Sequence, residues 1–436
     1  MRLLEMLWYA VNGLTRKPHA ARKLATLAIA VSTLFALSQV LKDLISENTV
    51  VSFCLQWIWV PLSLVFLILR YGEILKRRKF RRFFQSIDFV GYDGFIPEYE
   101  ESAAVNQHLY RVRFRSRIHP SEWEKKKTYI EMFFKRRIYK IEETMEDITT
   151  MDIFIIENSL PTLIEWREDY MQTGRRFAVG MGYKGEVVWD ASILPHGIVA
   201  GATGGGKSTL LRVIAYQAIH KKFNVQVFDF KAGGDFSSIE SEYLKYNDLE
   251  FGYGPIVISE PEMARNVLVS LIVEVRLRME QFKNAEVANI DEYNALGRDQ
   301  FIPWLLIIDE AAEILDVKVK DKEEKALYSE IDQSLRTLAR ISRAAGVHIL
   351  FGIIRPSHDV LDGQIKNNAL WRVCGYFADS SASRIVLEND NATKLPSEVK
   401  GRFIVGGEEV QAYYLPIRKT IQHDRDIIDP DYHKSS

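Results

Sequence analysis

The residues with the clearest chemical potential form a glycine-rich loop between a short apolar run and a helical run. The apolar run is 197–200, the loop reads GATGGGKS over residues 201–208, and a helical pattern continues from Thr209 to His220. Glycines let backbone N–H groups curve around phosphate oxygens, and the start of a helix adds a favourable dipole. The spacing is that of a Walker A loop, so the sequence predicts a nucleotide site at this phosphate loop.

The residues of the phosphate loop have separate expected roles. Lys207 is placed to reach the β- and γ-phosphates of ATP, and Ser208 is placed to bind Mg²⁺. The other expected members of the nucleotide site are Gly201, Ala202, Thr203, Gly204, Gly205, Gly206 and Thr209. The alternative interpretation is a glycine-rich turn with an incidental lysine, and the strand, loop and helix context argues against it.

A second group of chemical residues follows the apolar run 303–308, which reads PWLLII. That run ends in Asp309 and Glu310, as a Walker B strand does. Asp309 is expected to hold Mg²⁺, and Glu310 is expected to act as the general base that polarises the attacking water. Apolar strands ending in acidic pairs also occur by chance, so this assignment depends on the phosphate loop. Asp229, after another apolar run, is a weaker candidate for the same pocket.

The elements that must position these residues are short apolar runs alternating with helical segments after residue 176. Six runs have this character: 197–200, 225–230, 255–259, 304–308, 347–353 and 371–377. Continuous apolar runs are typical of parallel strands covered by helices on both faces. The pattern predicts an α/β domain over residues 176–417, followed by a polar tail over 418–436.

Residues 70–175 predict a small α+β domain. Residues 110–118 alternate, which places four arginines on one face of a strand: Arg111, Arg113, Arg115 and Arg117. This row could hold phosphates, but a solvated face, or pairing with acidic residues such as those at 142–147, is the favoured interpretation. Residues 121–146 have the apolar spacing of an amphipathic helix.

Two uncharged apolar runs near the start, 24–41 and 50–69, predict a transmembrane hairpin. At about 1.5 Å per helical residue, each spans most of a bilayer core of about 30 Å. Basic residues lie on both flanks, which predicts a cytoplasmic segment 1–23 and a cytoplasmic location for everything after residue 70. The alternative for the first run is a signal-peptide core. The basic cluster at 76–82 is expected to contact anionic lipid rather than nucleic acid.

Bulk properties narrow the possibilities further. The chain has 436 residues, 47% of them hydrophobic, which is enough for two or three units with buried cores. Its net charge of −1 gives no overall attraction to nucleic acid. The two cysteines, Cys54 and Cys374, match no zinc or redox spacing, so a disulfide framework is not expected.

The segments around these motifs resemble the FtsK/SpoIIIE family of DNA translocases. The matching segments are LPH (194–196), DFKAGGD (229–235), NIDEYN (289–294), IIDE (307–310), RAAGVH (343–348), RPS (355–357) and SR (383–384). The resemblance implies a RecA-like P-loop ATPase motor domain that uses ATP with Mg²⁺. It also implies a homohexameric ring with ATP sites between subunits and DNA in the central channel.

The resemblance suggests further functional residues. Arg343 or Arg384 is expected to approach the γ-phosphate bound by a neighbouring subunit, the alternative being an ion pair within one subunit. Lys366 and Lys394 are expected to contact DNA phosphates, the alternative being ordinary surface lysines. Ile354 stands where the family usually has glutamine before Arg-Pro-Ser, so a polar sensor of the γ-phosphate is missing.

Two membrane spans and one motor domain are most similar to the plan of TcpA-type coupling proteins of Gram-positive conjugative plasmids and integrative conjugative elements. The predicted function is a membrane-anchored DNA translocase that delivers DNA to the proteins of a conjugation channel. The DNA is expected to be single-stranded and bound to a relaxase. The alternatives are a type VII-like protein-secretion ATPase, a chromosome-segregation DNA pump, and a membrane scaffold with a degenerate ATP site.

Overall fold

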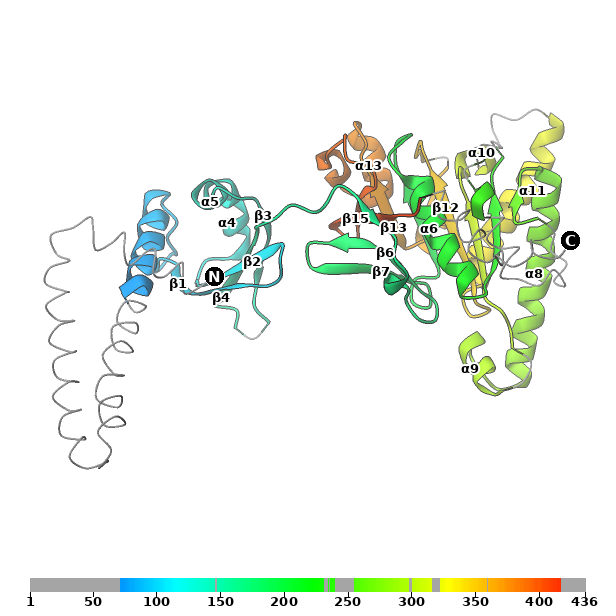
Figure 1. Ribbon diagram of the computed structural model, residues 1–436, viewed down its shortest axis with the longest axis horizontal. Helices are drawn as coiled ribbons and strands as arrows, with labels where there is room; N and C mark the ends of the chain where they lie inside the picture. The colour runs from blue at the N-terminus through cyan, green and yellow to red at the C-terminus, as the bar shows by residue number, and fades with distance from the viewer. Residues whose placement is uncertain are drawn as a thin grey trace, which may run out of the picture. The chain divides into compact units, whose positions relative to one another are not determined.

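The computed structural model describes residues 71–145, 147–230, 234, 236–239, 255–297, 300–315, 322–358 and 360–416. The predicted segment 1–23, the hairpin over 24–69 and the tail over 418–436 lie outside these ranges. Within the described ranges, no helix combines the length and apolar character needed to cross a membrane. Contacts divide the chain into two compact units, one ending at Ser159 and one beginning at Leu160 (Figure 1).

The first unit contains a four-stranded antiparallel sheet with helices against its apolar face. The strand order is β1-β2-β4-β3, and the strands are β1 (Glu98–Ala104), β2 (Leu109–Arg115), β4 (Thr150–Ile156) and β3 (Ile138–Glu143). A helix over 71–86 contributes Phe80 and Phe84 to the core, where they meet Phe114 of β2 and Trp123 of helix α4 (Pro120–Lys125). The core of this unit is therefore strongly aromatic.

The helix predicted over 121–146 is wrong beyond residue 134. Helix α5 covers Lys127–Phe134 and ends where Lys135 adopts a left-handed backbone conformation with φ 55°. Strand β3 follows, and its pairing with β4 shifts register between Ile138 and Lys140. Because of this irregularity, the buried residues Ile138 and Ile141 are three positions apart, a spacing that imitates a helix.

The arginine row pairs with acidic side chains, as the favoured interpretation expected. Arg113 makes a bidentate salt bridge with Asp152, in which Nε donates to Oδ1 at 2.7 Å and Nη2 donates to Oδ2 at 2.8 Å. The remaining pairs are Arg111 with Glu101, Arg115 with Glu100, and Arg117 with Asp93. The acidic partners come from β1, β4 and a turn rather than from 142–147. Paired in this way, the row is not free to hold phosphates.

The second unit is built on an eleven-stranded sheet whose first six strands are parallel. In spatial order these are β10 (Val257–Ile258), β9 (Asn224–Phe228), β11 (Trp304–Ile308), β12 (Val347–Ile353), β8 (His196–Ala200) and β13 (Trp371–Gly375). Each overlaps one of the six apolar runs, so the prediction of a parallel α/β domain is confirmed.

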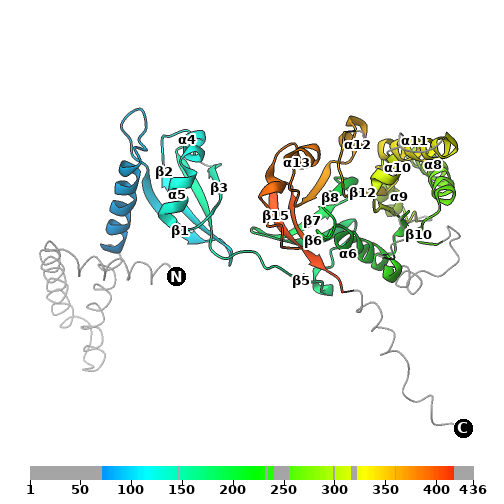
Figure 2. The same cartoon turned by 90° about the horizontal axis from the view of Figure 1, so that it is seen from above.

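Helices cover both faces of the parallel strands, which explains why the strands are apolar throughout (Figures 1 and 2). Side chains of β11 alternate between two cores: Leu306 packs with α8 (Pro261–Asn284) and α11 (Lys322–Ile341), and Leu305 packs with α6 (Lys207–His220). The shorter helices are α9 (Ile290–Ala295), α10 (Ala311–Leu315), α12 (Gly363–Asn368), α13 (Ser380–Leu387) and the 3₁₀ turn η3 (Asn391–Lys394). Burial on both faces fixes the central strands and the loops that leave their carboxyl ends.

An antiparallel extension, which the sequence analysis did not predict, continues the sheet beyond β13. It consists of β14 (Arg402–Val405), β15 (Glu408–Tyr414), β6 (Arg176–Gly182) and β7 (Gly185–Asp190). The two-residue strand β5 (Ile164–Glu165) pairs with β15, and the 3₁₀ turn η1 (Glu168–Tyr170) follows it. The unit thus includes residues 160–175, which the sequence analysis placed in the preceding domain.

Candidate nucleotide-binding site

The phosphate loop joins the carboxyl end of β8, an interior strand of the sheet, to the first turn of α6. Gly204 and Gly206 have φ values of 78° and 101°, a backbone region that suits glycine. Gly206 also lies against Gly401, whose backbone nitrogen would be 2.8 Å from a Cβ at position 206. The loop conformation therefore requires glycine at position 206, the second of the two glycines that the Walker A pattern fixes.

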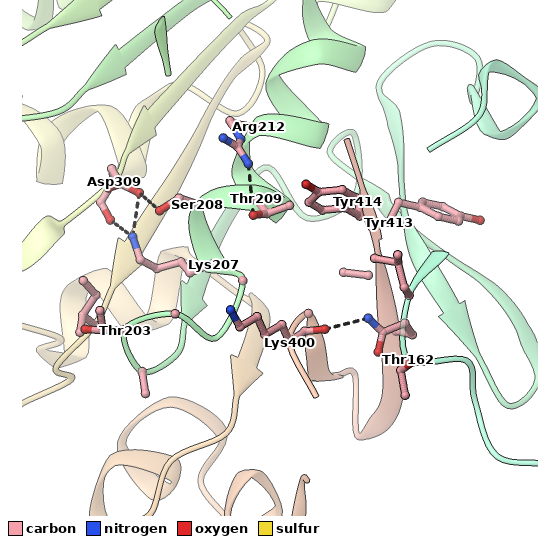
Figure 3. Close-up of a pocket in the computed structure, with 18 of the residues that line it drawn as sticks. Thr162, Thr203, Lys207, Ser208, Thr209, Arg212, Asp309, Lys400, Tyr413 and Tyr414 are labelled. Atoms are coloured by element: carbon pink, nitrogen blue, oxygen red, sulfur yellow. Dashed lines mark hydrogen bonds and ion pairs between the residues drawn. The ribbon is translucent and has the colours of Figure 1, made fainter. Parts of the chain in front are cut away.

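Three predicted site residues meet at the end of the loop (Figure 3). Lys207 Nζ donates a hydrogen bond to Asp309 Oδ1 at 2.7 Å and a second one to the main-chain oxygen of Asp309. Ser208 Oγ lies 3.1 Å from the same carboxylate oxygen. The Lys207 side chain is only 4% exposed. A buried ammonium, a hydroxyl and a carboxylate thus converge at one point.

This set of groups fits Mg²⁺ bound together with a nucleotide. Mg²⁺ prefers oxygen ligands and is usually held by one or two protein oxygens together with substrate phosphates. Ser208 and Asp309 offer a hydroxyl and a carboxylate at adjoining positions. Across the described ranges, no group of three or more His, Cys, Asp or Glu side chains could hold a metal ion alone. The site therefore suits a Mg²⁺ ion that binds together with the phosphates of a nucleotide.

A cavity of about 730 Å³ opens beside the phosphate loop. Lys207, Ser208 and Asp309 line one part of it, and buried Asp229 also reaches it. The weaker candidate Asp229 is therefore placed in the same pocket. The far wall comes from sequence regions that the sequence analysis did not associate with the site: Thr162, Leu163, Lys400, Gly401 and Gln411 to Tyr414.

Glu310 follows Asp309 directly, but it is not among the described residues that line this cavity. Both of its carboxylate oxygens lie near the backbone nitrogen of Ile354, at 3.2 and 3.1 Å, and accept its N–H. Ile354 is the position where the related family usually has glutamine. Its contact with the proposed base uses the backbone, so the isoleucine side chain leaves that contact intact. A backbone contact carries no side-chain signal, and sequence reasoning missed it.

Gly352 allows β12 to approach the backbone of Ile308 and Asp309 closely. Gly352→Ala is therefore expected to lower stability by about 1–3 kcal/mol through overpacking. A Cβ at position 352 would lie 2.3 Å from the main-chain oxygen of Asp309 and 2.9 Å from that of Ile308. Thermal or denaturant unfolding measures the loss. Gly363→Ala is the matched control because nothing lies within 4 Å of its added Cβ. Equal stability of the two variants would contradict the close contact.

The two candidate arginines lie at opposite ends of the parallel strands, Arg343 at the amino ends and Arg384 at the carboxyl ends. Arg343 precedes β12 and lies near His196 at the start of β8; burial lowers the pKa of His196 to about 3, and the charge of Arg343 acts in the same direction. β12 has seven residues, so it separates Arg343 from the phosphate-loop edge by roughly 20 Å. Arg384 is exposed on α13, which follows the carboxyl end of β13 near the loop. The structure therefore brings neither arginine into the group formed by Lys207, Ser208 and Asp309.

The two candidate DNA-binding lysines have acidic partners within the chain. Lys366 on α12 lies 3.9 Å from Glu388, and its side chain is 18% exposed. Lys394 lies 3.1 Å from Asp390, and its side chain is 65% exposed. These contacts lower the pKa values of both carboxyls; for Glu388 the largest cause is its hydrogen bond with Arg372, and for Asp390 its hydrogen bond with Lys394. Of the two lysines, Lys394 is the more accessible.

The profile of the FtsK/SpoIIIE family matches residues 163–358. The chain is 30% identical over 272 residues to the DNA translocase SftA of Bacillus subtilis, a match to 58% of this chain and 27% of that protein. It is 28% identical over 265 residues to the DNA translocase FtsK of Oceanobacillus iheyensis, a match to 54% of this chain and 32% of that protein. The chain thus spans about a third or less of the length of these relatives.

One solved structure resembles the chain over most of its length. It is the pCW3 conjugation coupling protein TcpA, in its monomer form with ATPγS. The sequence identity is 30% and the TM-score is 0.56. The match covers 80% of this chain and 99% of the TcpA chain.

Proposed function

Since the chain belongs to the FtsK/SpoIIIE family, we propose that it is an ATP-driven DNA translocase. The observation that carries this proposal is the convergence of Lys207, Ser208 and Asp309 beside a glycine loop at the carboxyl end of a parallel strand. In this arrangement the loop amides and Lys207 bind the phosphates of ATP. Ser208 and Asp309 would hold Mg²⁺, which would supply positive charge beside the phosphates.

In the proposed reaction, Glu310 accepts a proton from the water that attacks the γ-phosphate, the bond from the γ-phosphorus to the bridging oxygen breaks, and ADP and inorganic phosphate leave. Its present hydrogen bond to the N–H of Ile354 links it to the end of β12. The segment after Ile354 leads to α12, which carries one of the candidate DNA-contacting residues, Lys366. DNA bound along that segment would act on the general base, Glu310, through the backbone of Ile354. This supplies a route from DNA to hydrolysis without the family's glutamine.

We further propose that the protein serves as the coupling protein of a conjugation system. The similarity to TcpA, which extends over 99% of that chain, supports this choice over a chromosome-segregation pump. In this proposal the hairpin over 24–69 anchors the protein in the cell membrane, the motor lies in the cytoplasm, and a homohexameric ring surrounds the DNA. A relaxase attached to the DNA and the channel proteins would then be its partners.

DNA-stimulated ATP hydrolysis tests the proposed function. The full chain, purified in detergent, is expected to hydrolyse ATP several-fold faster when DNA is added. A translocase couples each cycle of ATP hydrolysis to movement along DNA. Single-stranded and double-stranded DNA are assayed separately, and heparin controls for nonspecific polyanion effects. Hydrolysis that is indifferent to both forms of DNA would contradict the proposal and favour a protein-secretion ATPase.

Mixed rings test whether an arginine acts between subunits. Arg343→Ala leaves the phosphate loop intact, and Lys207→Ala leaves the arginine intact. A random equal mixture places an intact loop against an intact arginine at about a quarter of the interfaces. If Arg343 acts on the neighbouring site, the mixture is expected to recover ATPase activity that neither variant has alone. The same test applies to Arg384.

The control for this experiment is a ring whose subunits all carry both substitutions, which has no competent interface. Mixing must be verified, for example with two affinity tags purified in sequence. Verified mixed rings without recovered activity would assign the arginine to its own subunit or to no catalytic role.

A further inference from the structure

We propose that the purine base of the bound nucleotide lies against Tyr414 and Leu163, in the part of the cavity beyond the phosphate loop. This inference rests on the proposed function and deepens it, because it assigns the base-binding end of the ATP site. The cavity, about 730 Å³, extends beyond the phosphate loop to both residues. A nucleotide whose phosphates occupy the loop would place its base in this extension.

The wall that carries these two residues is built from distant segments and is fixed by hydrogen bonds. β5 pairs with β15 in parallel, with Ile164 opposite Tyr413 and Glu165 opposite Tyr414. The N–H of Trp166 donates to the main-chain oxygen of Tyr414 at 2.8 Å. The buried guanidinium of Arg402 donates to the main-chain oxygens of Leu160 and Pro161, at 3.3 and 2.9 Å. The segment around Leu163 is thereby held beside β15.

The two adjacent tyrosines of β15 have different environments because successive side chains of a strand point to opposite faces. Tyr413 is 1% exposed, stacks on Tyr170 with ring centres 4.4 Å apart, and donates its hydroxyl to Glu186. It is a packing residue. Tyr414 is 37% exposed and Leu163 is 57% exposed, although both are large and apolar. An aromatic ring and a leucine left accessible in one cavity suit a flat, apolar ligand surface.

The direction of the cavity agrees with this placement. Asp309 and Lys207 lie on one side of the loop, and Tyr414 lies on the other side, toward Thr209 and Arg212 of α6 (Figure 3). If the γ-phosphate points to the Asp309 side, as the proposed reaction requires, the base points to the Tyr414 side. The Tyr414 ring is directed toward Thr209, whereas the Tyr413 ring points away from it.

The wall favours stacking over reading of the base edge. Gln411, which also lines the cavity, uses its amide nitrogen on the main-chain oxygen of Lys400 and its amide oxygen on Arg402, both at 2.9 Å. Its amide oxygen and one of its two amide hydrogens are therefore already bonded within the protein. Stacking depends on ring area, so the site should prefer purines to pyrimidines.

Binding measurements on the full chain separate the base from the phosphates. Calorimetry compares ATP, UTP and inorganic tripolyphosphate, each with Mg²⁺. Tyr414→Ala and Leu163→Ala are each expected to weaken ATP binding roughly 10-fold, to weaken UTP binding less, and to leave tripolyphosphate binding unchanged. Tyr414→Phe keeps the ring and should bind ATP as the wild type does. Ile193→Ala, at a 62% exposed position outside the cavity, is the matched control.

Two outcomes would overturn the inference. Equal weakening of ATP and tripolyphosphate would mean that the substitutions disturb the phosphate loop, and unchanged ATP binding in both alanine variants would place the base elsewhere. The two variants lie on separate segments, so a folding defect in one leaves the other as a test. Failure of the proposed function would appear differently, as a wild-type chain that binds neither ATP nor tripolyphosphate.

Discussion

Glu310→Gln is expected to bind ATP but to hydrolyse it roughly 100-fold or more slowly than the wild type, within the range for loss of a general base. Glutamine has the size of glutamate, and its amide oxygen can still accept the N–H of Ile354. The substitution therefore keeps the local packing at this buried position while it removes the group that accepts a proton. The proposed DNA transfer would depend on hydrolysis and should be abolished.

Two measurements check this expectation: equilibrium binding of ATPγS and steady-state hydrolysis with DNA present. Glu313→Gln is the matched control, because Glu313 lies one helical turn further on and is exposed. It should hydrolyse ATP normally. If Glu310→Gln retained the wild-type rate, the assignment of the base would be wrong, and a reduced rate in Glu313→Gln would move the assignment to Glu313.

The phosphate loop and the parallel strands could be predicted because their signals are local. Eight consecutive residues define the loop, and each central strand is a short apolar run whose burial on both faces removes any alternation. The antiparallel extension gave no comparable signal. β15 pairs with β5 and β6, which are more than 200 positions away, so its role as a wall of the site depends on contacts that only the folded chain makes.

Contacts through the backbone and through charge pairs escaped prediction for related reasons. The missing glutamine at position 354 suggested a lost sensor, yet the backbone N–H of Ile354 contacts Glu310 whatever the side chain. The arginines of β2 were expected to find acidic partners, but the partners' positions depend on strand order, which places β2 between β1 and β4. β3 was mistaken for helix because a register shift spaces its buried residues by three.

Lys207→Ala is expected to weaken ATP binding roughly 100-fold or more and to abolish hydrolysis and DNA transfer, because a buried cation that contacts phosphate is lost. The structure adds a second effect. In the absence of nucleotide, Lys207 neutralises Asp309, whose side chain is only 11% exposed. Removing the ammonium leaves a largely buried carboxylate with the Ser208 hydroxyl near it, and breaking a buried pair costs about 3–5 kcal/mol before solvent from the cavity reduces it.

The double variant Lys207→Ala with Asp309→Asn separates these two effects. Asparagine has nearly the shape of aspartate and carries no charge, so the double variant should recover much of the stability that Lys207→Ala loses. It should recover no ATP binding, since both the phosphate-binding cation and the proposed metal ligand are absent. Thermal unfolding without nucleotide measures the first property, and ATPγS titration measures the second. If the double variant were no more stable than Lys207→Ala, the pair would contribute to nucleotide binding alone, and the loss of stability would have to come from the cavity left by the lysine side chain.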